Sequence, residues 1–168
     1  ATLTKSWVDT VADTKVAIRD TRKTTPGLRE LEKYAVRMGG GENHRFSLSD
    51  AALIKDNHVL AAGGVASAFN LVKKKFPNLP LEVEVDSLQQ LREVIEAGAD
   101  LVMLDNMSIE ECRAAVEIVA GRAKLEASGG LILNNAHAYA KTGVDYLAVG
   151  ALTHSAPVLD IGLDLRME

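Results

Sequence analysis

Short runs of apolar and β-branched residues alternate with amphipathic segments along the whole sequence, and this alternation restricts the possible folds more than any other feature. Short runs bounded by turn residues indicate strands, whereas an apolar residue at every third or fourth position indicates a helix. Strands that alternate with helices predict a parallel sheet, and near-continuous apolar strands fit such a sheet because helices cover it. The predicted strands are Val16–Asp20, Leu53–Lys55, Leu81–Asp86, Leu101–Asp105, Lys124–Ala127, Tyr146–Val149 and, more weakly, Leu159–Leu163.

The number of strand–helix units determines the size of the predicted sheet. At about 30 residues per unit, the chain holds roughly five or six units. The segment GADLVM at 98–103 resembles GVDYLA at 143–148, which supports a repeating architecture. We therefore expect residues 1–168 to form a single α/β domain, a small or incomplete parallel barrel of about six units that is similar to a TIM barrel. An open doubly wound sheet is the second choice.

The first predicted helix carries a start signal and two distinct faces. Thr25 can cap this helix, with Pro26 at its first position, where a missing N–H costs nothing. An apolar face is formed by Leu28, Leu31, Ala35 and Met38. The opposite face, which we expect to be solvated, carries Arg29, Lys33 and Arg37. Two later helices are predicted to begin with a capping box, Ser87 with Gln90 and Ser108 with Glu111.

The composition excludes several classes of protein. A net charge of -4 argues against nucleic acid as the main partner. No apolar run is long enough for a membrane helix, and the single cysteine, Cys112, excludes an internal disulfide, so we expect a cytoplasmic protein. The charge is uneven, because residues 15–58 carry nine Lys and Arg against six Asp and Glu. A cationic segment in an acidic protein indicates a small anionic ligand.

Polar residues follow the carboxyl ends of nearly every predicted strand, where parallel α/β folds gather their functional residues. In strand order they are Arg22 and Lys23, then Lys55, Asp56, Asn57 and His58, then Asp86, then Asp105 and Asn106, then Glu126 and Ser128, and finally Gly150 and His154. Within the third strand, Glu82 and Glu84 alternate with apolar residues and share one face with Asp86. Buried carboxylates need partners, so this face is predicted to meet a ligand, a metal or basic groups. Asp86 and Asp105 have a simpler reading as helix caps.

Glycines after the last two strands are typical of a phosphate-binding loop. Ser128-Gly129-Gly130 and Gly150-Ala151 let backbone N–H groups approach an anion closely. α/β barrels commonly hold phosphate at these two loops. The four histidines and one cysteine lack the compact spacing of a zinc site.

Several segments resemble signatures of the quinolinate phosphoribosyltransferase family. They are DTRKTTPGLR at 20–29, GGGENHR at 39–45, LIKDNH at 53–58, EVEVD at 82–86, VGALTHS at 149–155 and LDIGLD at 159–164. The match is collinear over essentially the whole chain, and the first segment alone is specific. The chain therefore resembles the barrel domain of that family.

The resemblance implies a reaction and a set of site residues. The family transfers phosphoribosyl from phosphoribosyl pyrophosphate to quinolinate, with loss of CO2 and pyrophosphate, and gives nicotinate mononucleotide for NAD biosynthesis with Mg²⁺ as cofactor. By position, the two carboxylates of quinolinate would be held by Arg22, His44, Arg45 and Lys55. Lys23 would face the phosphoribosyl substrate, while Glu84 and Asp105 would address the ribose hydroxyls and the metal. The phosphates would be held by Ser128, Gly129, Gly150 and His154.

The resemblance also implies partners. Family members carry an N-terminal α/β domain, which we expect to be absent from this chain, and that domain lends a basic residue to the neighbouring subunit. A homodimer or a higher homo-oligomer is therefore expected of the full-length protein, and weak or no activity of the barrel alone. Two alternatives remain open: a barrel that binds its ligands without turnover, and a related phosphoribosyltransferase that acts on nicotinate.

Overall fold

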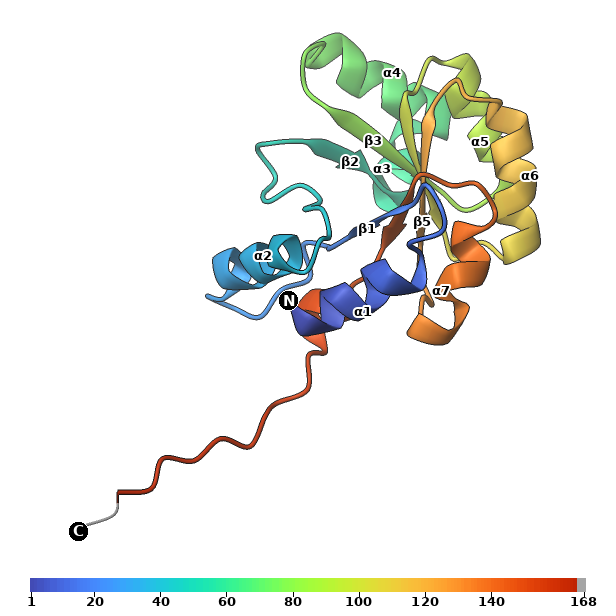
Figure 1. The fold of residues 1–168 in the computed structure, drawn as a ribbon. Coiled ribbons are helices and arrows are strands. Elements are labelled where there is room, and N and C mark those ends of the chain that lie inside the picture. Colours follow the sequence, from blue (N-terminus) through green and yellow to red (C-terminus); the bar gives the residue numbers. More distant parts are fainter. Residues whose placement is uncertain (166–168) are drawn as a thin grey trace.

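One parallel sheet of six strands forms the centre of the molecule (Figure 1). The computed structural model describes residues 1–165. The strands are β1 (Ala17–Arg19), β2 (Ala52–Ile54), β3 (Leu81–Val85), β4 (Leu101–Asp105), β5 (Lys124–Ser128) and β6 (Tyr146–Ala148). The helices of this part are α1 (Thr2–Thr10), α2 (Arg29–Met38), α3 (Asp56–Ala62), α4 (Val65–Lys75), α5 (Leu88–Glu96), α6 (Ile109–Val119), α7 (Leu133–Ala140) and α8 (Ala151–His154). Six predicted strands are confirmed to within one or two residues.

The order of the strands is that of an incomplete barrel. The sheet runs β1-β6-β5-β4-β3-β2, so each strand from β2 to β6 lies beside the next one in sequence, and β1 then joins β6. In a doubly wound sheet the order in which successive strands are added reverses at a switch point, and the order of β2 to β6 shows no such reversal. Among the described residues no ladder joins β1 to β2, so the ring stays open between these two edges. The first choice of fold is therefore confirmed.

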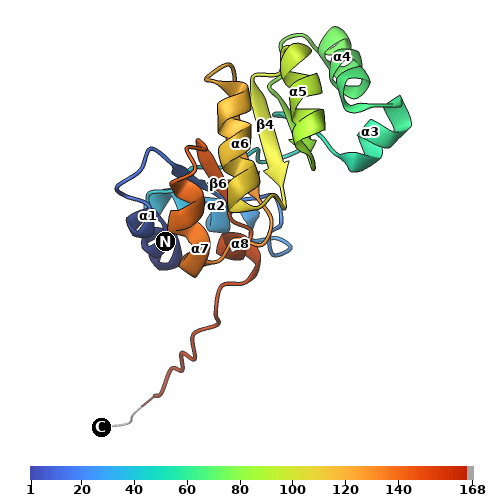
Figure 2. The same cartoon turned by 90° about the vertical axis from the view of Figure 1, so that its right-hand side faces the viewer.

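Helices cover the outer side of the curved sheet. Figure 2 shows α3, α4, α5, α6, α7 and α1 in series, and each packs against its neighbour in that series. The strand residues that face them are apolar and fully buried, namely Val83, Val85, Val102, Leu104 and Leu125. Because side chains alternate along a strand, the residues between them point to the inner side. The inner side is thus where the strands present Glu82, Glu84, Met103, Glu126 and Tyr146.

Helix ends follow the sequence signals in most places. The Ser108 hydroxyl accepts from the Glu111 backbone N–H, and the Glu111 carboxylate accepts from the Ser108 backbone N–H, which completes a capping box at α6. Ser87 caps α5 by accepting from the Gln90 N–H, but the Gln90 side chain accepts from the Asp86 N–H instead of the Ser87 N–H, so the predicted capping box is only half formed. These two predicted starts are confirmed. The following helices consequently leave the strand ends at fixed positions, which places the site loops.

Helix α2 begins later than predicted. It starts at Arg29 with Leu28 before it, and Thr25 and Pro26 lie in the preceding turn. The Thr25 N–H donates to the Glu32 carboxylate instead of the Thr25 side chain capping the helix. The predicted cap at Thr25 is therefore wrong. The turn before α2 instead belongs to the loop that carries Arg22 and Lys23 into the site.

The exposure of the two faces of α2 differs from the expectation at several positions. On the apolar face, Leu31 and Met38 are 66% and 58% exposed. On the face expected to be solvated, Lys33 is only 2% exposed and pairs with the buried carboxylate of Asp20 on the loop after β1. Arg37 is exposed, as predicted. A buried lysine needs an acidic partner, and the sequence pattern of α2 alone does not reveal Asp20 as that partner.

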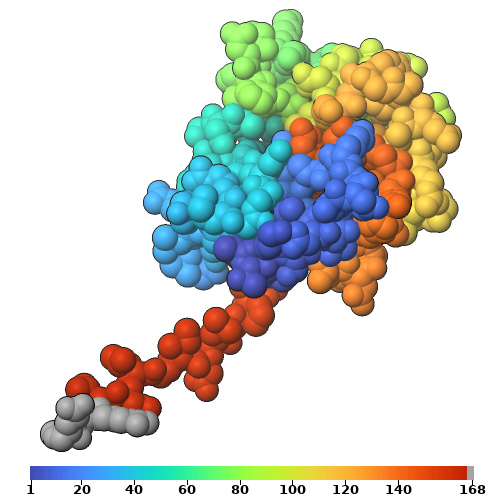
Figure 3. All heavy atoms as spheres, in the orientation of Figure 1, coloured from blue at the N-terminus to red at the C-terminus, as the bar shows by residue number. Residues whose placement is uncertain are grey.

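The chain leaves the body of the molecule after α8. The weak seventh strand predicted at 159–163 does not form, and Leu159 and Leu163 are 76% and 95% exposed. A strand needs a neighbour to pair its backbone groups, and this segment extends away from the body of the molecule (Figure 3). In residues 1–165 no helix combines the length and the apolar character needed to span a membrane.

Candidate active site

A cavity of about 280 Å³ lies at the carboxyl ends of the strands, inside the open ring. Eight of the eleven predicted site residues line it: Arg22, Lys23, His44, Arg45, Lys55, Glu84, Asp105 and Ser128. They come from the loop after β1, the loop before β2, and the ends of β2, β3, β4 and β5. The parallel sheet therefore brings residues separated by up to 106 positions, from 22 to 128, onto one small volume.

The other three predicted residues, Gly129, Gly150 and His154, lie beside the cavity lining. Gly129 follows the lining residue Ser128 and has a φ of +87°, and a Cβ built there would come within 2.1 Å of the Asn106 Oδ1 atom. A Cβ on Gly150 would come within 2.5 Å of the His154 Nε2 atom. Gly129 is thus required by its backbone conformation and by the close Asn106 backbone, whereas at Gly150 only the His154 ring would have to move. Their role toward phosphate stays a prediction.

Two guanidinium groups converge on one side of the cavity. Arg45 donates to the Ala51 carbonyl at 3.0 Å, while Arg29 donates to the Arg22 carbonyl at 3.1 Å and so holds the loop of Arg22. Burial, and then the positive charge of Arg22, lower the pKa of Arg45. Within the described chain the buried Nε of Arg22 makes no hydrogen bond. Glu82 and Asp50 act on the pKa of Arg45 in the opposite sense but weigh less, so this side of the cavity keeps a positive charge that can receive an anion.

Carboxylates from the ends of β3 and β4 line the same cavity. Glu84 pairs with Lys55, and Asp105 accepts from the Asn106 side chain at 2.8 Å. Glu84 and Asp105 also line a second hollow of about 310 Å³, which Asp56 and Asp86 border as well. The site therefore has a cationic half and an acidic half that meet at Glu84 and Asp105. Carboxylate oxygens are the ligands that Mg²⁺ prefers, so these two residues fit the predicted metal.

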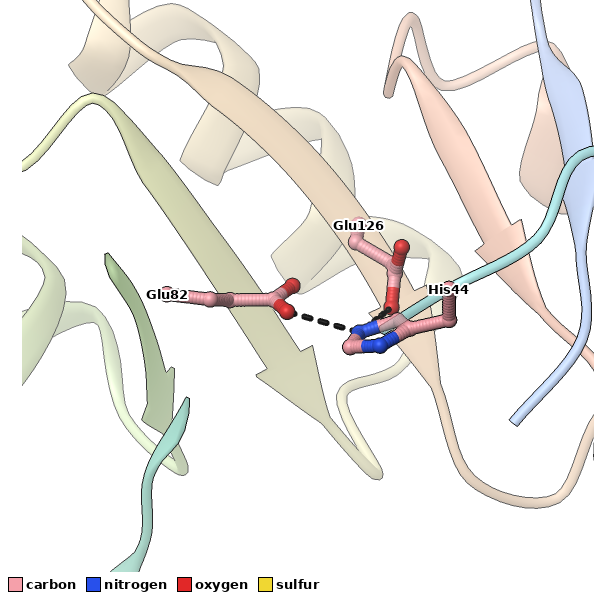
Figure 4. A group of neighbouring side chains, drawn as sticks. All are labelled: His44, Glu82 and Glu126. Carbon is pink, nitrogen blue, oxygen red and sulfur yellow. Dashed lines mark ion pairs between the residues drawn. The ribbon is translucent and has the colours of Figure 1, made fainter. Parts of the chain in front are cut away.

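Beneath the cavity the His44 side chain enters the ring and meets two buried glutamates (Figure 4). His44 Nε2 lies 2.7 Å from an oxygen of Glu82 and 3.4 Å from an oxygen of Glu126, and Glu126 also accepts from Arg19 at 3.0 Å. Burial lowers the pKa of His44, but Glu126 and Glu82 outweigh it and raise that pKa to about 9. The Arg45 backbone N–H donates to His44 Nδ1 at 2.8 Å and opposes this, because a charged imidazole has no free lone pair.

The group of His44, Glu82 and Glu126 also has the spacing of a metal site. One imidazole and two carboxylates are a ligand set that divalent transition metals accept. Here, however, the Arg19 guanidinium already takes one oxygen of Glu126, and it stacks over the Tyr146 ring at 3.5 Å. Arg19 therefore supplies the positive charge that a metal would supply here, and the binding of Mg²⁺ by Glu84 and Asp105 stays a prediction.

A buried ionic network fixes the backbone of His44. Asp20, which is fully buried, accepts from Lys33, from the Asn43 side chain and from the His44 N–H. Lys33 also donates to the His44 carbonyl at 2.9 Å. The sequence analysis did not assign Asp20, Lys33, Asn43 or Glu126 to the site. Asp20 and Asn43 lie within the motifs DTRKTTPGLR and GGGENHR, which was the signal that could have found them.

A larger cavity of about 740 Å³ lies on the outer side of β2, between this edge strand and helix α4. It is lined mainly by apolar side chains such as Leu53, Leu71 and Phe76. It offers only Arg45 and His58 as titratable groups. The smaller cavity, which holds most of the predicted residues, is therefore the candidate active site.

Fold and site together define the class: an α/β-barrel protein that binds a small anionic ligand at the carboxyl ends of its strands. The family model of the quinolinate phosphoribosyl transferase C-terminal domain matches residues 1–164. The chain belongs to this family.

Named relatives agree with this membership. The nicotinate-nucleotide pyrophosphorylase (carboxylating) of Mycobacterium leprae is 59% identical over 168 residues, which are 98% of this chain and 59% of the relative. The probable enzyme of the same name from Bacillus subtilis is 46% identical and is covered over 58% of its length. The solved structure of nicotinate-nucleotide pyrophosphorylase from Francisella tularensis has a TM-score of 0.88 and 50% identity, over 91% of this chain and 55% of that one. The chain thus spans less than two thirds of each relative.

Proposed function

We propose that this chain is the catalytic barrel of an enzyme that transfers phosphoribosyl from phosphoribosyl pyrophosphate to quinolinate, with release of CO2 and pyrophosphate. The product, nicotinate mononucleotide, is a precursor of NAD. The observation that carries the proposal is the convergence of Arg22, His44, Arg45 and Lys55 on one cavity of about 280 Å³. Quinolinate has two adjacent carboxylates, and two adjacent guanidiniums with further cations match that charge and shape.

The residues of the acidic half would act on the other substrate. Departure of pyrophosphate from the ribose builds positive charge at the anomeric carbon, and Glu84 and Asp105 lie where a carboxylate could stabilise that charge. Mg²⁺ held by these two residues would neutralise the leaving pyrophosphate. Lys23 at the same cavity would contact the phosphates, with Ser128, Gly129, Gly150 and His154 on the neighbouring loops. The mechanism is electrostatic, and it forms no covalent bond to the protein.

Product formation and substrate choice test the proposal together. We expect this chain, or the chain joined to the remainder of its full-length protein, to form nicotinate mononucleotide from quinolinate, phosphoribosyl pyrophosphate and Mg²⁺. Arg45→Ala should weaken quinolinate binding, whereas Arg37→Ala, an exposed control on α2, should not. A preference for nicotinate over quinolinate would refute the dicarboxylate assignment. Binding of both substrates by the full-length protein without any product would support a non-catalytic module instead.

A homo-oligomer and a cytoplasmic location are further parts of the proposal. The outward apolar face of α2, with Leu31, Tyr34 and Met38 exposed, supports association with another protein surface. Burial, and then the charge of Glu111, raise the pKa of the Cys112 thiol to about 12, so this cysteine is unreactive and suits a reducing compartment. Light scattering of the full-length protein tests the first of these, and a monomer would refute it.

A further inference from the structure

The inside of the barrel beneath the cavity is filled by charged side chains. In an ordinary α/β barrel this space holds layers of Val, Ile and Leu. Here it holds Arg19 from β1, Glu82 from β3, Glu126 from β5 and the imidazole of His44. Glu82 is 4% exposed and Glu126 is fully buried. Burying these groups costs free energy, so their presence calls for a role that apolar side chains cannot fill.

The geometry of the cluster ties this layer to His44. Figure 4 shows the two carboxylates approaching the same nitrogen of the ring from different strands. Nε2 carries a hydrogen whether the imidazole is charged or neutral with Nδ1 as acceptor, so both carboxylates attract it in either state. Within the described residues, Glu82 Oε1, Glu126 Oε1 and His44 Nε2 itself meet no hydrogen-bond geometry, so the ring is held by charge attraction to Glu82 Oε2 at 2.7 Å and Glu126 Oε1 at 3.4 Å. Apart from the bond between Glu126 and Arg19, the two carboxylates thus face the imidazole ring and make no other side-chain hydrogen bond among the described residues.

The orientation of the ring passes directly to Arg45. His44 Nδ1 accepts from the backbone N–H of Arg45 at 2.8 Å, so the ring plane and the peptide of Arg45 are fixed relative to each other. The backbone of His44 is held separately, by Asp20 and Lys33. The backbone contacts of Asp20 and Lys33 hold His44 from outside, and its imidazole reaches from there into the barrel. Glu82 and Glu126 hold its inner end.

We propose that Glu82 and Glu126 are positioning residues, which hold the His44 imidazole inside the barrel and thereby aim His44 and Arg45 at the carboxylates of the bound pyridine ring. This inference rests on the proposed function for the identity of the ligand. It adds two residues that do not touch the ligand, since neither lines the cavity. Arg19 completes the device, because it holds the outer oxygen of Glu126 at 3.0 Å and keeps that carboxylate turned toward the ring.

Calorimetric binding of quinolinate and of phosphoribosyl pyrophosphate to this chain separates positioning from general damage. We expect Glu82→Ala and Glu126→Ala to weaken quinolinate binding by about tenfold or more, because a misplacement of about 1 Å is costly at a binding site. Binding of phosphoribosyl pyrophosphate should change by less than about twofold, since it falls on the other half of the site. Glu126→Gln should restore only part of the lost affinity, because its single amide oxygen can replace the oxygen that faces Nε2 or the one that faces Arg19, but not both. Glu117→Ala, on the exposed face of α6, is the matched control.

A second measurement does not depend on the ligand. The Nε2 hydrogen of His44, assigned in ¹H–¹⁵N spectra with a His44→Gln variant, should exchange slowly with solvent in the unaltered chain, where the ring is 9% exposed. It should exchange rapidly in the two alanine variants, while circular dichroism shows an intact fold.

The outcomes distinguish the positioning role of Glu82 and Glu126 from the proposed function. Folded alanine variants that bind quinolinate as tightly as the unaltered chain, or that keep the slow exchange, would overturn the positioning role and leave the proposed function standing. Equal loss of both substrates would also overturn it, since that marks general damage to the site. Unaltered full-length protein that binds phosphoribosyl pyrophosphate but not quinolinate would overturn the proposed function, and the identity of the ligand with it.

Discussion

Replacing Lys33 by methionine tests whether the buried network around Asp20 holds the site together. The change keeps the length of the side chain and removes its charge, so the Asp20 carboxylate is left buried without its cation. Lys33 also loses its hydrogen bond to the His44 carbonyl. Helix propensity is a minor consideration, because methionine and lysine are nearly equal in helices.

The expected loss follows from the contacts that remain. Breaking a buried ion pair by removing one partner costs about 3 to 5 kcal/mol. Asp20 still accepts from the Asn43 side chain and from the His44 N–H, so we expect the lower end of that range, about 3 kcal/mol. For a domain of this size, each kcal/mol lowers the melting temperature by about 2 to 4 °C, so the shift should be about 6 to 12 °C.

Urea denaturation followed by circular dichroism measures the free energy of unfolding directly. The control is Arg37→Met on the exposed side of α2, which should change that free energy by less than about 0.5 kcal/mol. Lys33→Met combined with Asp20→Asn should recover much of the loss, because no uncompensated charge is then buried. A loss below about 1 kcal/mol for Lys33→Met, or a double variant no more stable than the single one, would refute the reasoning.

Three further predictions concern the site itself. The raised pKa of His44 stabilises the folded chain fully below pH 6.5, and this contribution, at most about 3 kcal/mol, is lost as the pH rises through about 9. The free energies of unfolding at pH 6 and pH 10 should therefore differ less in His44→Asn than in the unaltered chain. An equal pH dependence in the two proteins would contradict this prediction. Glu84→Gln should lower turnover in the full-length protein and its response to Mg²⁺ while the melting temperature stays unchanged, and unaltered turnover would remove Glu84 from the mechanism. Gly129→Ala should destabilise the chain more than Gly63→Ala. Both glycines have positive φ, but of the two only Gly129 is packed against Asn106. Equal effects of the two substitutions in thermal unfolding would show that this packing is unimportant.

The architecture was accessible from the sequence because each of its signals is local. The strand of Leu101–Asp105 is five residues of near-continuous apolar character, and the capping box of Ser108 and Glu111 fixes where the next helix starts. Such signals depend on neighbours within a few positions, so they survive without knowledge of the tertiary structure. The same holds for strand-end residues such as Glu84, because every parallel strand ends at the same edge of the sheet.

Apart from the Thr25 cap, the failures involve partners that lie outside the segment from which the prediction was made. The pattern of α2 predicted a solvated Lys33, but Asp20 on the loop after β1 draws this residue inward. The segment 159–163 has the composition of a strand and no sheet edge to join. Glu126 was noted only as a polar strand residue, because its contacts with Arg19 and His44 span 107 and 82 positions. Pairings of this kind are decided by packing, which a single sequence does not display.

The position of β1 in the sheet has a consequence for how the chain folds. Among the described residues β6 is the one strand that pairs with β1, through pairs such as Ala17 with Tyr146, and on its other edge β1 has a single bridge to Glu42; its place in the sheet is therefore created by a strand that is synthesised 129 residues later. Strands β2 to β5 pair with near neighbours and can assemble early, whereas closure of this long loop is slow and comes late. Arg22 and Lys23 follow β1, so the anion-binding half of the site is completed in the same late step. A nascent chain that has not yet reached β6 can hold the acidic half of the site, but not the half that would recognise the ligand.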